Sequence, residues 1–208
     1  MKVTQKVFKN LGEIVNPSHT CLVVWDVQNG LVSSIFNRED FLQSLSHFLQ
    51  KARGKEIPVV YTKITPLPTT YESSWRLYMM MKKYGLDAPD KLPQFMQPGS
   101  PEAEIHDTVS PLESDTVLKK HTASIFIGTH FESMLRNRDI NTILFTGIAT
   151  EIGIDSSARD SSNRGFYTVV VPDCVSSADK EMHDLTLKVL PRVCLVIPST
   201  EIVTQWKN

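Results

Sequence analysis

The chain has 208 residues, of which 41% are hydrophobic and 22% are charged, a size and balance that fit one α/β domain with a substantial core. Its net charge of −1 gives no long-range attraction to nucleic acid or to an anionic membrane surface. Three cysteines without metal-ligand spacing argue against a disulfide framework, and an N-terminus without the apolar core of a signal peptide agrees with a cytoplasmic protein.

Six short apolar segments are predicted as strands. They contain few polar residues in alternation, which is typical of strands buried on both faces of a parallel sheet. In chain order they cover residues 21–25, 58–61, 116–118, 142–145, 167–171 and 193–197.

Amphipathic segments separate these strands and are predicted as helices. They cover residues 41–52, 75–83, 129–135, 150–164 and 179–190. The β-α-β order predicts right-handed crossovers and a doubly wound, mainly parallel six-stranded sheet with helices on both faces, which is a Rossmann-like three-layer arrangement.

The stretch from about residue 64 to 111 is less regular and is rich in proline and methionine. We interpret it as an insertion that forms a lid or an oligomer contact, because long irregular connections in compact domains are usually functional. The whole chain, 1–208, is therefore predicted to be a single domain.

Polar residues follow three of the predicted strands at their carboxyl ends. Asp26 and Gln28 follow the first strand, Lys120 follows the third, and the turn 146–153 follows the fourth. Ligands of doubly wound sheets bind at this rim, so a site is predicted here. Trp25 is expected to point away from Asp26 into the core, and Gln28 to share the side of Asp26 and orient it.

These segments resemble the isochorismatase-like hydrolases, the family of cysteine hydrolases. The family pattern has Asp-x-Gln, then Lys-x-x-x-Ser-x-Phe-x-Gly-Thr, then Thr-Gly-x-Ala-Thr-x-x-Cys. Here it is represented by Asp26–Gln28, Lys120–Thr129 and Thr146–Gly153, within a resemblance that runs from about Cys21 to Ile202.

The resemblance implies roles for the site residues. In the cysteine hydrolases of the family, the residue matching Asp26 takes the thiol proton and the residue matching Lys120 stabilises charge. Backbone N–H groups at Ala149 and Thr150, at the start of the helix after the fourth strand, would form an oxyanion hole. The family has a cis peptide bond before this helix, and here it is expected at Ala149–Thr150. Gly153 occupies the position of the nucleophilic cysteine, so thioester chemistry cannot occur there.

Glycine at this position resembles the true isochorismatases, which hydrolyse a vinyl ether without a cysteine nucleophile. In them the residue matching Asp26 protonates the vinyl carbon, and Gly153 would make room for substrate. The sequence does not decide whether Asp26 acts as an acid or as a base. Those enzymes also have a Gln soon after the second strand, where this chain has Ile64, and an Arg for which Arg76 is the nearby counterpart.

Three functions therefore remain open: a small-molecule hydrolase without a Cys nucleophile, an inactive homologue that binds a metabolite or serves as an assembly subunit, and an amidase that uses Cys174. The Asp-x-His metal motif of nicotinamidases is missing after the second strand, so neither a metal nor a cofactor is expected. The predicted partners are a small-molecule substrate and further copies of the chain in a homo-oligomer.

Overall fold

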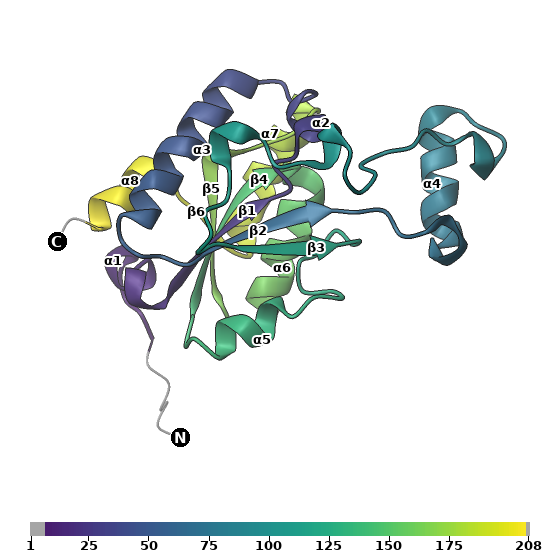
Figure 1. Cartoon of the computed structure of the whole chain (residues 1–208). Helices are drawn as coiled ribbons and strands as arrows, with labels where there is room; N and C mark the ends of the chain where they lie inside the picture. Colours follow the sequence, from purple (N-terminus) through teal and green to yellow (C-terminus); the bar gives the residue numbers. More distant parts are fainter. Residues whose placement is uncertain (1–6, 207–208) are drawn as a thin grey trace.

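The computed structural model describes residues 7–206 and shows one six-stranded sheet (Figure 1). Residues 1–6 belong to the N-terminus in which no signal peptide is expected, and they lie outside the described residues. The strand order is β3-β2-β1-β4-β5-β6 and every pairing is parallel, which confirms the predicted doubly wound sheet. The strands are β1 (Thr20–Trp25), β2 (Val59–Ile64), β3 (Thr116–Lys120), β4 (Thr142–Ile148), β5 (Tyr167–Ser176) and β6 (Leu195–Val196).

Helices cover both faces of the sheet, and each face has its own hydrophobic core. Alternate residues of β1 divide between them: Leu22 and Val24 face one core, whereas Cys21, Val23 and Trp25 face the other. The first core packs against α1 (Leu11–Ile14), α3 (Arg38–Arg53) and α8 (Ser199–Gln205), and the second against α5 (Phe131–Arg136) and α6 (Asp155–Asn163). The remaining α-helices are α2 (Asn29–Val32), α4 (Ser74–Tyr84) and α7 (Lys180–Val189).

The turns after β1 and β4 have unusual backbone geometry. Asp26 follows β1 with a φ of 45°, in the left-handed region that non-glycine residues rarely adopt. Gly147, near the end of β4, has a φ of 118°, and a Cβ there would lie 2.0 Å from the carbonyl oxygen of Trp25. Glycine is thus required at 147 both by its backbone conformation and by the close approach of β1.

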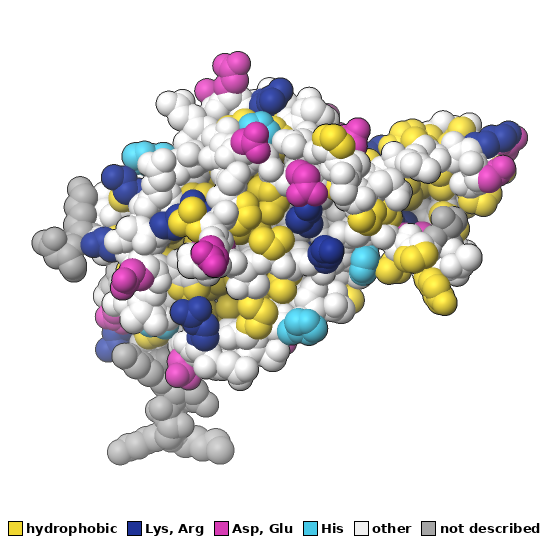
Figure 2. Space-filling model, viewed as in Figure 1, with side chains coloured by type: hydrophobic (Ala, Val, Ile, Leu, Met, Phe, Trp, Pro, Cys, Tyr) yellow, Lys and Arg dark blue, Asp and Glu magenta, His cyan; other side chains and the backbone are white. Residues whose placement is uncertain are grey.

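The segment between β2 and β3 forms the irregular excursion that the sequence predicted. It contains α4 and the short 3-10 helices Thr69–Tyr71, Pro89–Lys91, Pro101–Ala103 and Asp107–Val109. Figure 1 shows α4 standing out from the body of the molecule, and Figure 2 shows hydrophobic side chains along this projecting part. Trp75 and Tyr78 are 68% and 54% exposed, and their rings stack on each other.

None of the helices within residues 7–206 is long and apolar enough to cross a membrane.

Gly147→Ala is expected to destabilise the protein severely, by about 4 kcal/mol or more, because the added methyl group meets the β1 backbone. Gly165→Ala is the matched control. Gly165 has a φ of 79° but open space around it, so only the backbone cost of about 1–2 kcal/mol applies. Urea denaturation measures both, and equal losses of stability in the two variants would contradict the close approach at Gly147.

The predicted homo-oligomer is expected to use the exposed aromatic residues of α4, since exposed apolar surface of this kind is typical of contacts between proteins. Trp75→Glu/Tyr78→Glu should lower the molar mass measured by light scattering and leave the circular dichroism spectrum unchanged. Lys82→Glu, on the same helix, is the control. An unaltered mass for the double variant would show that α4 makes no contact between subunits.

Candidate active site

A cavity of about 420 Å³ lies at the carboxyl ends of β1, β3 and β4. Four of the residues named in the sequence analysis, Asp26, Lys120, Ala149 and Gly153, line it, and Trp25 lines it as well. A second cavity of about 400 Å³ lies at the opposite end of the strands, beside Cys21 and Thr116. Because ligands of doubly wound sheets bind beyond the carboxyl ends of the strands, the first cavity is the candidate active site.

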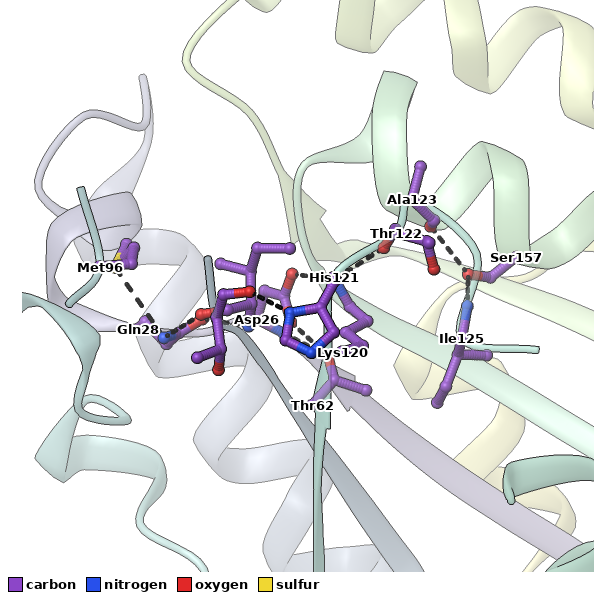
Figure 3. A network of polar contacts seen from close by, with 12 residues as sticks. Asp26, Gln28, Thr62, Met96, Lys120, His121, Thr122, Ala123, Ile125 and Ser157 are labelled. Atoms are coloured by element: carbon purple, nitrogen blue, oxygen red, sulfur yellow. Dashed lines mark hydrogen bonds and ion pairs between the residues drawn. The ribbon is translucent and has the colours of Figure 1, made fainter. Parts of the chain in front are cut away.

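The centre of the site is a buried ion pair. Lys120 Nζ lies 2.5 Å from Asp26 Oδ2, and the two side chains are only 1% and 5% exposed (Figure 3). Lys120 also donates to the backbone oxygen of Thr122 at 3.3 Å. The carboxylate and the ammonium, which are 94 residues apart in the chain, thus meet at one rim of the sheet.

Thr62 of β2 bridges the backbone and the side chain of Asp26. Its hydroxyl donates to Asp26 Oδ1 at 2.5 Å and accepts from the Asp26 N–H at 3.0 Å. No local sequence pattern identifies Thr62, because a buried threonine in a strand is an ordinary residue. Only the position of β2 between β1 and β3 shows that Thr62 faces the carboxylate.

Burial and pairing act against each other on the two charged groups. Burial is the largest influence on Asp26 and raises its pKa, while Lys120 and the Thr62 hydroxyl oppose that rise. Burial lowers the pKa of Lys120, and Asp26 opposes that fall. The protein environment therefore brings the proton affinities of the two groups closer together than they are in water.

Gly153 makes no room for substrate, contrary to the expectation from the sequence. A Cβ at position 153 would lie 2.0 Å from Trp25 Nε1 and 2.2 Å from Trp25 Cε2. The indole ring already fills this space. Trp25 is 1% exposed and belongs to the core, as predicted, but it also forms a wall of the cavity.

Gln28 does not line the cavity, and its side chain bonds Ile64 and Ala103 rather than Asp26, which it was expected to orient. Its amide nitrogen donates to the backbone oxygens of Ala103 at 2.8 Å and Ile64 at 3.2 Å, and its amide oxygen accepts from the Ile64 N–H at 2.8 Å. Figure 3 shows the side chain turned toward Met96 and away from Lys120. Gln28 instead fastens Ile64, where the excursion begins, and Ala103, within the excursion, to the segment that follows β1.

The turn after β4 approaches the cavity through Ala149. The cis peptide bond lies at Ile148–Ala149, one residue earlier than expected. A π-helix, Thr150–Ile154, follows and leads into α6. The Thr150 hydroxyl is engaged with the oxygen of Ser176 at 3.2 Å and with His183 Nδ1 at 2.8 Å, and Thr150 is not among the residues described as lining the cavity.

The mouth of the cavity is formed partly by the excursion. Arg76 and Lys83 of α4 and Phe95 line it together with Ile64 and His121. Arg76 donates to the backbone oxygen of His121 at 2.9 Å, which links α4 to the segment that follows β3. Three of the lining side chains, Arg76, Lys83 and Lys120, are cationic, and one, Asp26, is acidic.

The cysteines offer no substitute nucleophile. Cys21 and Cys174 are fully buried and Cys194 is half-buried. Burial raises the pKa of Cys174 above its ordinary range and that of Cys194 to about 12, so neither thiol is activated. None of the three is among the residues described as lining the cavity.

Within residues 7–206, no group of three or more His, Cys, Asp or Glu side chains is arranged to hold a metal ion.

Comparison with known proteins agrees with the fold and with the motifs. The isochorismatase domain matches this chain over residues 20–201. The chain belongs to the isochorismatase family. Several of the proteins that match this chain are named as hydrolases.

The relatives are distant in sequence. The ureidoacrylate amidohydrolase RutB of Methylobacterium radiotolerans is 28% identical over 183 residues, which cover 80% of this chain and 70% of that protein. The uncharacterized isochorismatase family protein YecD of Escherichia coli O157:H7 is 28% identical over 199 residues, covering 91% and 97%. A cysteine hydrolase from Pseudomonas syringae pv. phaseolicola 1448A has the same fold, with a TM-score of 0.79 over 98% of both chains at 19% identity.

Removing one member of the ion pair is expected to change how stability depends on pH. In Lys120→Met, Asp26 loses the cation that lowers its pKa. The folded state then keeps a proton that the unfolded state releases, so stability relative to the parent falls as the pH rises above about 3.9.

For the complementary variant, Asp26→Asn, the slope of stability against pH should have the opposite sign. In Asp26→Asn, Lys120 loses the anion that raises its pKa. The folded state then releases a proton that the unfolded state keeps, and stability relative to the parent rises with pH up to about 10.4. Urea denaturation from acid to alkaline pH measures both slopes, and the double variant is the control. Slopes of the same sign would contradict the pairing.

Proposed function

We propose that the chain is a hydrolase of small anionic molecules that uses Asp26 as a proton donor and forms no covalent enzyme intermediate. The observation that carries this proposal is the buried Asp26–Lys120 pair beside a cavity in which position 153 has no side chain. A vinyl ether is the substrate class that fits these residues, because its hydrolysis needs an acid and a water molecule but no nucleophilic side chain.

The reaction begins with proton transfer from the Asp26 carboxyl group to the terminal vinyl carbon. The electrons of the C=C bond form the new C–H bond, which leaves an oxocarbenium ion. Water adds to the carbon that bears the ether oxygen, and the proton it loses returns to the Asp26 carboxylate. The resulting hemiketal loses its alcohol, whose oxygen takes up the hydroxyl proton, and a carbonyl compound remains.

Asp26 has an environment suited to the first step. Burial, the largest influence on its pKa, favours the protonated carboxyl group. After the proton has left, Lys120 Nζ at 2.5 Å and the Thr62 hydroxyl at 2.5 Å stabilise the carboxylate that forms. The pair thus supports both protonation states of Asp26 that the cycle requires.

The charge of the cavity suits an anionic substrate. Arg76 and Lys83 add positive charge at its mouth, beyond the cation that Asp26 neutralises. The Ala149 oxygen accepts from the N–H groups of Ile152, Gly153 and Ile154. The two N–H groups before them, at Thr150 and Glu151, stand at the start of the π-helix and can stabilise negative charge on a bound oxygen. The apolar side chains Leu31, Ile64 and Ile148 form part of the wall.

Asp26→Asn is expected to lower the rate of vinyl-ether hydrolysis about 10²–10⁴-fold, the usual contribution of a general acid. The asparagine keeps the shape of the side chain but has no acidic proton. The assay follows carbonyl release from isochorismate and from simpler vinyl ethers. Asp107→Asn, at an exposed carboxyl group, is the matched control, and an undiminished rate in folded Asp26→Asn would reject the proposal.

Two further outcomes separate the alternatives. Absence of Asp26-dependent turnover across a broad substrate panel would favour a metabolite-binding homologue or an assembly subunit. Loss of activity after alkylation with iodoacetamide would point to a thiol. We expect iodoacetamide to leave the activity unchanged, because Cys174 is fully buried and its pKa is raised.

A further inference from the structure

Trp25 lies where the nucleophile of a cysteine hydrolase would begin. The three atoms nearest to a Cβ built on Gly153 all belong to the Trp25 indole, at 2.0, 2.2 and 2.5 Å. Real Cβ atoms do not approach other heavy atoms so closely, and both residues are buried, so the ring has little space to withdraw. The indole and a side chain at 153 therefore exclude each other.

The same ring contacts the ion pair. Lys120 Nζ lies 3.8 Å from the centroid of the Trp25 ring, within the range of a cation–π interaction. Lys120 is thus held from two directions, by the carboxylate of Asp26 and by the face of the indole. In a site sheltered from water this contact is stronger than at an exposed surface.

The indole N–H is available to a ligand. Among the described residues no hydrogen-bond acceptor for Trp25 Nε1 is found, whereas the other buried tryptophan, Trp206, donates to the oxygen of Val15 at 2.8 Å. Buried indole N–H groups usually have a partner. Because Trp25 lines the cavity, the acceptor can come from a bound molecule.

We propose that Trp25 is a specificity-determining residue that fills the space of the missing nucleophile, holds Lys120 through its ring face and limits the depth of the cavity. The part of this inference that concerns the choice of substrate rests on the proposed function. Its geometric part, the mutual exclusion of Trp25 and a side chain at 153, is independent of any activity.

A cycle of variants tests the exclusion. Gly153→Ala should lower the urea midpoint strongly in the parent and only slightly in a Trp25→Leu background, where the shorter side chain leaves space for the methyl group. Gly54→Ala, at an exposed helix end, should have the same effect in both backgrounds. An equal loss from Gly153→Ala in the two backgrounds would overturn the proposal.

Alkylation tests whether the vacated space opens to the cavity. In Trp25→Leu/Gly153→Cys, the introduced thiol should react with iodoacetamide in the folded protein, as detected by mass spectrometry of the peptide that contains position 153. The buried Cys21 and Cys174 serve as unreactive internal references. A folded double variant whose introduced thiol reacts only after denaturation would contradict a cavity wall at Trp25. If this variant does not fold, the alanine cycle decides.

Kinetics test specificity separately. With two vinyl ethers of different size, Trp25→Leu should shift the ratio of their kcat/KM values at least about tenfold toward the larger one, the scale on which pocket contacts discriminate. Trp25→Phe keeps an aromatic face but removes the N–H, and should retain the preference for the smaller substrate with a higher KM. An unchanged ratio in Trp25→Leu would reject the specificity role, whereas loss of Asp26 dependence would reject the proposed function instead.

Discussion

The buried contact between Asp26 and Lys120 constrains the rest of the site. Removing two opposite charges from water costs several kcal/mol for each ion, and this cost is offset only when the geometry and the additional hydrogen bonds are good. The sheet supplies both. Asp26 follows β1, Lys120 ends β3, and Thr62 lies on the strand between them, so the ion pair and Thr62 connect three adjacent strands at their carboxyl ends.

Much of this arrangement could be predicted from the sequence. The six apolar segments identified the strands, because residues buried on both faces of a sheet leave a continuous apolar signal. The parallel order then placed Asp26 and Lys120 at one rim, although 94 residues separate them. The sixth strand is shorter than expected, Leu195–Val196, and it pairs with β5 at the edge of the sheet.

The remaining features depend on contacts that no local pattern carries. The left-handed φ of Asp26 ends the strand alternation, so Trp25 and Asp26 both reach the cavity although adjacent strand residues normally face opposite sides. Thr62 has a role only through its neighbours on two strands. The space at position 153 looks empty in the sequence, and it is filled by a residue 128 positions earlier in the chain.

The anchoring by Gln28 has a consequence for how this fold diversifies. One side-chain amide binds the backbone at Ile64, where the excursion leaves the sheet, and at Ala103, where the chain lies beside the segment that follows β1. The chain between these points can change in length and composition while its two ends stay fixed beside β1. The cover of the cavity, and with it the choice of molecules admitted, can therefore evolve separately from the carboxylate and ammonium beneath it.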